Sequence, residues 1–172
     1  MPLERFSAAW REAYIQEATV RERSGNSGPC VFCELASMEP GPDSGVVAHS
    51  ELSYVCLNAY PYGSGHLLAL PRRHVAGLGE LTDDEYFDLF AMVREATRSV
   101  EVAYGPDGLN IGANLGRASG AGIPGHLHVH VLPRWNGDTN FMASIAETRV
   151  LPESLATTWE KVSDAWGRSR SS

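Results

Sequence analysis

The alternation of apolar and polar residues along the chain predicts several short strands and one long helix. Three early runs rich in β-branched and aromatic residues predict a hairpin followed by a third strand, which ends at Pro71. Two later runs predict a fourth and a fifth strand with a glycine-rich loop between them. In chain order the strands are VVAHS, SYVCLNAY, HLLALP, LNIGAN and HLHVHVLP, and the loop is LGRASGAGIPG.

The long helix is predicted between the third and the fourth strand. Thr82 is followed by acidic residues in the form of a capping box, which places negative charge in the first turn, where the helix dipole favours it. The helix is expected to continue to about Ala103, because the glycine and proline of YGPDG then stop it. Its predicted apolar face comprises Tyr86, Leu89, Phe90, Val93, Thr97 and Val100.

Two further helices are predicted, one near each end of the sequence. Phe6, Trp10 and Tyr14 recur at helical spacing, which indicates an amphipathic helix up to about Arg23. A last helix is expected over roughly residues 152–166. Strands, a helix and two more strands joined by short connections predict an α+β fold with a mainly antiparallel sheet of about five strands.

The length predicts one domain with two extensions. A chain of 172 residues is long enough to bury a single sizeable core, and two full domains are not expected. The expected divisions are an N-terminal helical extension (1–28), a central domain (29–145) and a C-terminal helical tail (146–172).

Composition and charge narrow the range of partners and locations. No apolar run approaches the about 20 residues that a membrane span needs, so no membrane association is expected. The start of the chain carries acidic residues and lacks a continuous apolar core, so we expect a reducing, cytoplasmic location without a secretory signal. A net charge of -7 disfavours nucleic-acid polymers as partners but still allows a small anionic ligand at a local site.

Three of the six histidines lie on alternate positions of the fifth predicted strand, as His126, His128 and His130. Because side chains of a strand alternate between its two faces, the three imidazoles are expected on one face, with the intervening Leu and Val residues in the core. Imidazole can act as a nucleophile, a proton carrier or a metal ligand, because its ordinary pKa of about 6.5 lies near neutral pH.

The residues alone leave other interpretations of this strand open. One is a solvated or tag-like histidine face, although a tag would not alternate with Leu and Val. Another is a metal centre with three histidines, although same-face neighbours lie roughly 7 Å apart and each ring would have to reach the ion at about 2.1 Å.

The sequence resembles the histidine triad family of nucleotide hydrolases and transferases. HLHVHVLP fits the family signature His-φ-His-φ-His-φ-φ, where φ is apolar. Upstream, LNAYPYGSGHLLALPRRH is similar to a second motif, in which a ribose-binding Asn or Asp precedes a Gly-His pair; here these are Asn58, Gly65 and His66. CVFCELA resembles the family's N-terminal Cys-x-x-Cys segment, and the resemblance runs from about Cys30 to Asn140.

This resemblance implies a two-step enzyme reaction through a covalent intermediate. His128 would attack the α-phosphorus of an adenine-type nucleotide and form a nucleotidyl-histidine, which water or phosphate would then cleave. His130 would bond the phosphate oxygens or protonate the leaving group. His126 and His66 would orient the cluster through hydrogen bonds that fix ring tautomers. Neither an organic cofactor nor a catalytic metal is implied.

The glycine-rich loop before the fifth strand is a candidate phosphate site. Backbone N–H groups near Gly116 and Gly120 can approach an anion closely because glycine lacks a Cβ, and Ser119 adds a hydroxyl. The alternative is that these glycines serve turn geometry alone. By resemblance, Asn114 corresponds to an Asn near the phosphates, which completes the expected nucleotide-binding set with Asn58.

In this loop the sequence departs from the common family pattern. GAGI, at residues 120–123, stands where many members have Gly-Gln-Ser or Gly-Gln-Thr, whose Gln is a phosphate ligand in the dinucleoside polyphosphate hydrolases. The loop and the PRWNGDTNFM segment look more like the bacterial branch that includes diadenosine tetraphosphate phosphorylases. The expected activity is therefore cleavage of a dinucleoside polyphosphate at its α-phosphate, with water or inorganic phosphate as acceptor. An AMP-phosphoramidate hydrolase, and a nucleotide-binding or zinc-stabilised interaction module without turnover, stay open as alternatives.

A zinc site is expected beside the histidines. Cys30 and Cys33 are separated by the two-residue gap that lets both thiolates reach one ion, although a reduced, metal-free pair is the alternative. Some bacterial family members complete the site with two histidines, which correspond here to His74 and His126, so the resemblance implies a structural zinc. Family members usually pair through the long helix and a sheet edge, and a homodimer or larger assembly is expected.

Overall fold

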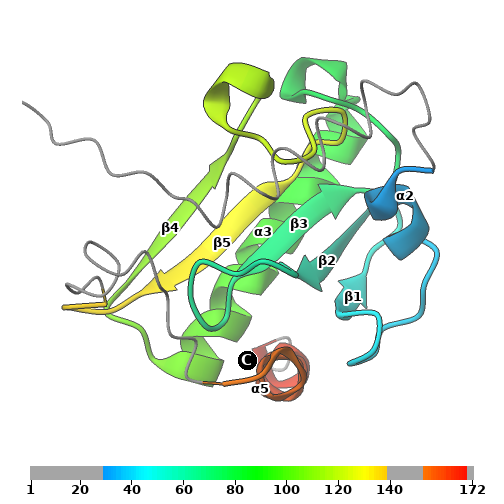
Figure 1. Cartoon of the computed structure of the whole chain (residues 1–172). Coiled ribbons are helices and arrows are strands. Elements are labelled where there is room, and N and C mark those ends of the chain that lie inside the picture. The colour runs from blue at the N-terminus through cyan, green and yellow to red at the C-terminus, as the bar shows by residue number, and fades with distance from the viewer. Residues whose placement is uncertain (1–28, 139–152, 170–172) are drawn as a thin grey trace, which may run out of the picture.

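One antiparallel sheet of five strands organises the protein. The computed structural model describes residues 29–138 and 153–169. The strand order is β1-β2-β3-β5-β4, and every neighbouring pair is antiparallel (Figure 1). The strands are β1 (Val46–His49), β2 (Ser53–Leu57), β3 (Leu67–Pro71), β4 (Gly108–Ala113) and β5 (Val129–Arg134). The predicted α+β class and the antiparallel sheet are confirmed.

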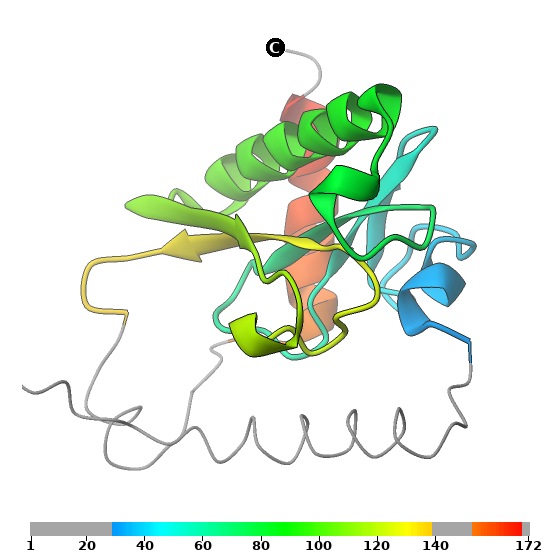
Figure 2. The same cartoon turned by 90° about the horizontal axis from the view of Figure 1, so that it is seen from above.

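The two faces of the sheet are covered differently. The long helix α3 (Asp83–Tyr104) lies along one face and packs against α5 (Leu155–Ser169). The short helix α2 (Val31–Leu35) and the loop with η2 (Arg117–Ser119) lie on the other side (Figure 2). A large apolar cluster fills the space toward α3 and α5, and a smaller one packs under α2. Among the described residues, no helix is long and apolar enough to cross a membrane.

The predicted capping box starts α3. The Glu85 N–H donates to Thr82 Oγ1, and the Thr82 N–H donates to a Glu85 carboxylate oxygen at 2.9 Å. At the other end Gly105 has φ 52°, the left-handed conformation that glycine adopts easily after a helix. The sequence therefore predicted both ends of this helix correctly.

The predicted apolar face of α3 is partly wrong. Leu89, Val93 and Val100 are buried, but Tyr86 and Phe90 are 42% and 37% exposed. These two rings lie on a neighbouring stripe, where they contact each other with centroids 4.7 Å apart. The buried stripe is completed by smaller or more flexible side chains, which allow α3 to lie close to the sheet: Met92, Ala96 and Ser99.

Several elements differ from the predictions. The fifth strand begins at Val129, so His126 and His128 lie in the segment that leads into it; the Leu127 N–H bonds the Val75 carbonyl at 2.6 Å. The short helix α2 was not predicted, and the last helix covers Leu155–Ser169 rather than 152–166. The helix predicted up to about residue 23 lies outside the described residues.

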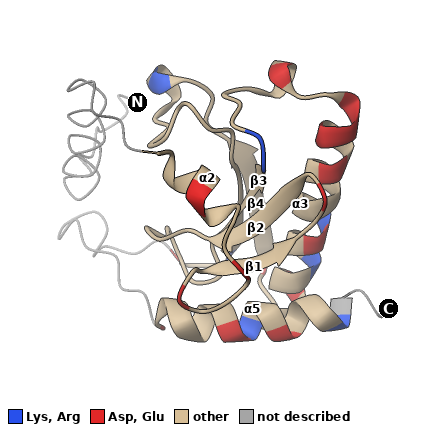
Figure 3. Cartoon of the chain, turned by 90° about the vertical axis from the view of Figure 1, so that its right-hand side faces the viewer, with Lys and Arg blue, Asp and Glu red and all other residues tan. Residues whose placement is uncertain are grey.

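Charge is distributed unevenly over the two sides. Figure 3 shows acidic residues mostly along α3 and α5, with α3 on the far side of the sheet from α2. Among the described residues, much of the acidic charge therefore lies on the face opposite the histidines, while Glu34 of α2 lies on the histidine side.

Candidate functional site

The three alternating histidines lie together on the α2 side of the sheet. Leu127 between them is 2% exposed and belongs to the cluster that faces α3, so the expected alternation holds although the strand starts late. His126 and His128 are 1% and 6% exposed. His130 is placed by β5, where it lies opposite Leu68 on one neighbouring strand and Gly112 on the other.

His128 has a fixed tautomer. Its Nδ1 lies 2.8 Å from the His126 carbonyl oxygen, which can only accept, so Nδ1 carries the proton and Nε2 keeps its lone pair. Burial lowers the pKa of His128, and the hydrogen bond to the backbone carbonyl opposes this effect. The ring is therefore neutral at pH 7 and presents Nε2 as a nucleophilic nitrogen. Phe32 of α2 packs on it, with ring centroids 5.2 Å apart.

His66 and His130 form a hydrogen-bonded pair. The Tyr62 N–H donates to His66 Nδ1 at 3.0 Å, so the proton of His66 is on Nε2. His66 Nε2–H then donates to His130 Nδ1 at 2.9 Å, which leaves the proton of His130 on its Nε2. His130 thus presents an N–H donor where His128 presents a lone pair, although the two rings lie only 5.1 Å apart.

Asn58 belongs to the same arrangement. Its side-chain amide lies 3.4 Å from His66 Nδ1, and its Oδ1 accepts the Tyr60 N–H at 3.0 Å. The Asn58 N–H also donates to the His66 carbonyl at 3.0 Å, which closes the loop between β2 and β3. The sequence-predicted Asn58 and His66 are therefore held together at the base of this loop.

Two cysteines and two histidines form a second cluster at the other end of the histidine segment. The ligand atoms of Cys30, Cys33, His74 and His126 all lie within 4.8 Å of one another. His74 Nδ1 is 3.3 Å from Cys33 Sγ, and His126 Nδ1 is 3.5 Å from Cys30 Sγ. Ligands of a tetrahedral zinc ion are separated by about 3.3–3.8 Å, given Zn–S and Zn–N lengths of about 2.3 and 2.0 Å.

The tautomer of His126 suits a metal ligand. Its Nε2 lies 2.9 Å from the Pro71 carbonyl oxygen and donates to it, so Nδ1 keeps a lone pair that faces the two sulfur atoms. A carbonyl bonded to the distal ring nitrogen is the usual support of a metal-bound histidine. The four residues therefore fit a zinc ion in donor type, spacing and orientation.

The glycine-rich loop contributes less defined geometry. Gly116 and Gly120 have φ of 75° and 83°, conformations that favour glycine. The Ser119 hydroxyl donates to the Gly116 carbonyl at 2.7 Å, so its proton is engaged within the loop. Asn114 directly follows β4, and Ile123 packs into the apolar cluster under α2, which ties the loop to the histidine side of the sheet.

Some groups that shape the site were not predicted from the sequence. Phe32 lies between the two cysteines and packs on both His126 and His128, with centroids 5.6 and 5.2 Å away. Its position inside CVFC was the available signal. The backbone groups of Tyr62 and Pro71 set two tautomers, and a backbone group leaves no signal in side-chain chemistry.

Comparison with known proteins gives consistent results. The profile of the HIT domain matches residues 40–137. An AP-4-A phosphorylase of Mycobacterium tuberculosis is 38% identical over 168 residues, which cover 96% of this chain and 86% of that protein. An adenosine 5'-monophosphoramidase of Schizosaccharomyces pombe is 27% identical over 78% of this chain and 96% of its own length.

A solved structure shares the fold. A zinc-bound histidine triad family protein from Mycobacterium smegmatis superposes with a TM-score of 0.67 and 24% identity, over 83% of this chain and 96% of that chain.

Proposed function

The chain belongs to the HIT domain family, and from this premise we propose that it is a nucleotidyl transferase that cleaves diadenosine tetraphosphate or a related dinucleoside polyphosphate by phosphorolysis. The relative with 38% identity is named an AP-4-A phosphorylase, and the alignment covers most of both proteins. The single observation that carries the chemistry is the contrast between His128, with an exposed lone pair on Nε2, and His130, with a proton on Nε2.

The proposed first step forms a bond between His128 Nε2 and the α-phosphorus. The bond from this phosphorus to the bridging oxygen breaks, and ATP leaves with the bonding electron pair. His130 Nε2–H hydrogen-bonds the phosphate oxygens as charge shifts onto the leaving group. His66 keeps that proton in place through its own bond to His130 Nδ1.

The proposed second step regenerates the histidine. An oxygen of inorganic phosphate attacks the phosphorus of the AMP–histidine, the P–N bond breaks, and ADP is released while His128 regains its lone pair. Asn58 would hold the ribose, and Asn114, Gly116, Ser119 and Gly120 would line the path of the phosphates. Each of these roles is part of the proposal.

We propose further that Cys30, Cys33, His74 and His126 hold a structural zinc ion. It would tie α2 to the segment that carries the nucleophile, because His126 contributes its ring to the metal cluster and its carbonyl to His128. Zinc bound by four protein ligands supplies stability rather than an open coordination position. A zinc-bound structure in the same family agrees with this assignment.

A homodimer in the cytoplasm completes the proposal. β4 is an edge strand of the sheet, and its Ile111 is 51% exposed. Tyr86, Phe87 and Phe90 form an exposed aromatic patch on α3, in which Phe87 is 69% exposed. An open sheet edge and exposed aromatics are features that oligomer interfaces cover. Light scattering at micromolar concentration tests this, and a monomer would contradict it.

The phosphoramidase named among the relatives favours a second candidate activity, the hydrolysis of AMP phosphoramidates. Both activities share the nucleotidyl–histidine and differ in leaving group and acceptor. The second candidate predicts AMP and ammonia from adenosine 5'-phosphoramidate without any need for phosphate.

One experiment separates the candidates. The protein is incubated with diadenosine tetraphosphate, with and without inorganic phosphate, and products and protein are followed by mass spectrometry. Phosphorolysis predicts ADP plus ATP with phosphate, and without it one equivalent of ATP and an AMP adduct on the peptide containing His128. AMP plus ATP at the same rate without phosphate would identify a hydrolase. The same assay is run with adenosine 5'-phosphoramidate, and absence of cleavage of both substrates would indicate a binding module without turnover.

A further inference from the structure

We propose that Glu153 is a positioning residue for the His66–His130 pair, acting through Tyr104 and the loop between β2 and β3. The inference rests on the proposed function in one respect, namely that the proton on His130 serves the leaving group. Glu153 lies in the C-terminal segment just before α5, far in sequence from the histidines. Its carboxylate bonds Tyr104, Thr158 and Lys161, so its effect on the histidines passes through packing.

The first link is the dependence of the histidine pair on the loop backbone. His66 Nδ1 receives the Tyr62 N–H at 3.0 Å, and the side-chain amide of Asn58 lies 3.4 Å from the same nitrogen. These donors exclude a proton from Nδ1 and place it on Nε2, from which it reaches His130. If the loop moved and the Tyr62 bond were lost, the proton on His66 could occupy either nitrogen.

The second link is the contact between the loop and Tyr104. Gly65, next to His66, has φ 74°. A Cβ placed on it would lie 2.9 Å from Cε2 of Tyr104 and 3.1 Å from Cγ of Pro133. The backbone at Gly65 therefore lies directly against the Tyr104 ring, and the position of that ring determines where the loop can lie.

The third link is the hydrogen bond from Tyr104 to Glu153. The Tyr104 hydroxyl donates to Glu153 Oε1, which also accepts the Thr158 hydroxyl at 2.9 Å, while the Lys161 ammonium donates to Oε2. Burial raises the pKa of Glu153, but the donors Lys161, Tyr104 and Thr158 outweigh it, so the pKa is lowered overall. The charged carboxylate thus joins the last residue of α3 to the first turns of α5.

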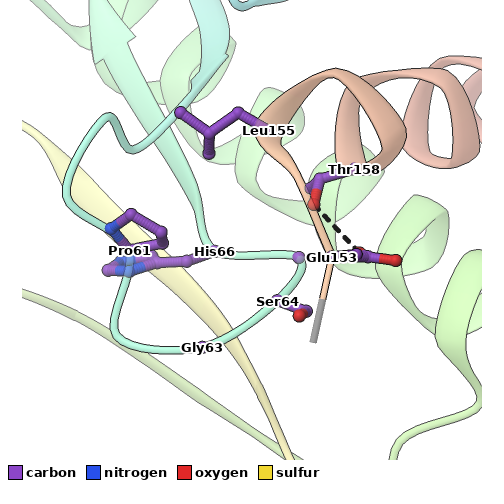
Figure 4. Close-up of a pocket in the computed structure, with 8 residues that line it drawn as sticks. Pro61, Gly63, Ser64, His66, Glu153, Leu155 and Thr158 are labelled. Atoms are coloured by element: carbon purple, nitrogen blue, oxygen red, sulfur yellow. Dashed lines mark hydrogen bonds between the residues drawn. The ribbon is translucent and has the colours of Figure 1, made fainter. Parts of the chain in front are cut away.

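A small cavity lies between the loop and this network. Figure 4 shows Pro61, Ser64 and His66 on the loop side, and Glu153, Leu155 and Thr158 on the other. Ser64 Oγ is buried there and has no hydrogen-bond partner among the described residues. The loop is therefore not bonded to the C-terminal segment through this side chain, and the cavity leaves room for it to shift once Tyr104 is released.

The test compares Glu153→Ala and Glu153→Gln with Glu160→Ala, which alters an exposed acid on the adjoining helix α5. The ¹⁵N chemical shifts of the histidine rings are recorded in the substrate-free protein. We expect Glu153→Ala to shift the His66 and His130 signals toward tautomer averaging, Glu153→Gln to do so less because its amide oxygen can still accept from Tyr104, and Glu160→Ala to change neither. Unchanged His66 tautomers in Glu153→Ala would overturn the proposal. If that variant does not fold, Tyr104→Phe removes the same link while keeping the ring, and the same two outcomes decide.

A kinetic measurement separates positioning from general damage. The amino nitrogen of adenosine 5'-phosphoramidate must gain a proton to leave as ammonia, whereas p-nitrophenolate leaves an AMP ester without a proton. We expect Glu153→Ala to lower kcat for the phosphoramidate between about ten- and a hundredfold with little change in KM, and to leave the ester nearly unaffected. Equal losses on both substrates would indicate a structural effect and overturn the proposal. If the wild-type protein cleaves neither of these substrates nor diadenosine tetraphosphate with phosphate, the proposed function fails, and the tautomer measurement still decides the role of Glu153.

Discussion

The two ends of the histidine segment use the same side chain in opposite ways. At one end His126 donates from Nε2 to the Pro71 carbonyl and turns a lone pair toward two sulfur atoms. At the other end His130 accepts at Nδ1 from His66 and carries its proton on Nε2. Between them, His128 donates from Nδ1 to a carbonyl and offers a lone pair on Nε2.

The difference lies in the backbone groups that the fold brings to each ring. A ring nitrogen bonded to a carbonyl oxygen must carry the proton, because the carbonyl can only accept. A ring nitrogen that accepts from a backbone N–H must instead keep its lone pair. The end at the proposed zinc ligands, here called the metal end, is therefore defined by the Pro71 carbonyl oxygen, and the end at the His66–His130 pair, the loop end, by the N–H of Tyr62. Three identical side chains therefore differ in which ring nitrogen is held by the protein and by which group.

The largest expected effect is on turnover, from a substitution of His128 in the middle of the histidine segment. His128→Ala removes the proposed nucleophile, so turnover should fall at least about a thousandfold, because the residual rate comes only from binding and electrostatic groups. Product formation by mass spectrometry measures this, and the AMP adduct should disappear. His49→Ala, which alters a histidine outside the cluster, serves as the control. An adduct that persists in His128→Ala would assign the nucleophile to another residue.

The second test removes the proposed zinc ion, or one of its ligands, and leaves the His66–His130 pair intact. At a zinc concentration a thousandfold above its Kd, a bound ion stabilises the fold by about 4 kcal/mol. Chelation or Cys33→Ser should therefore lower Tm by roughly 8–16 °C for a protein of this size. Metal analysis should give one zinc per chain before treatment, and the ¹⁵N signals of His66 and His130 should stay in place.

The matched control for this test is the double treatment. Chelator added to Cys33→Ser should produce no further fall in Tm, since the site is already broken. A zinc content of zero in protein prepared with zinc would contradict the assignment.

The third test introduces backbone strain into the loop between β2 and β3, next to His66. Gly65→Ala places a side chain at φ 74° against the Tyr104 ring, which costs on the order of 1–3 kcal/mol for the conformation alone. Tm should fall by roughly 2–12 °C, and the His66 tautomer signals should change. Gly63→Ala in the same loop is the control, because its nearest neighbour would be a Leu132 methyl at 3.8 Å, an ordinary contact. Equal Tm values for the two variants would show that Gly65 is not constrained.

The fold was largely predictable because its elements carry strong local signals. The capping box at Thr82, the glycine after Tyr104 and the strand patterns each act within a few residues. The five-residue helix α2 was not predicted, since it is too short for a periodic pattern. The late start of β5 was also missed, because the Leu127 N–H bonds the Val75 carbonyl outside the sheet.

The candidate site likewise has parts that the sequence could predict and parts that it could not. The histidines, the cysteines and Asn58 could be named from their spacing and from the family resemblance. The contacts that set tautomers could not, because they involve backbone groups brought together by the fold. Glu153 shows the limit most clearly, since its partners Tyr104 and Thr158 give no hint in the sequence that they support a histidine pair.

The smallest expected effect on Tm is at Glu85. This residue forms an ion pair with Arg73, which precedes the proposed zinc ligand His74. Arg73 Nε donates to Glu85 Oε1 at 2.6 Å, and this bond, followed by the one from the Thr82 N–H, lowers the pKa of Glu85 to about 2. The carboxyl is ordinarily titrated near pH 4.5. Its contribution to stability is therefore complete above pH 4.5 and is lost as the pH falls toward 2.

Glu85→Gln should remove this pH dependence. Because Arg73 is half exposed and solvent screens the pair, the loss in Tm at pH 7 should be only roughly 2–4 °C. Below pH 4.5 the Tm of the wild-type protein should fall more steeply than that of the variant, and the two curves should converge near pH 2. Asp84→Asn, an exposed acid in the same turn, should keep the wild-type slope. If both variants behaved alike, the effect would come from helix-end charge, and the segment that carries His74 would be held by its backbone bonds rather than by Glu85.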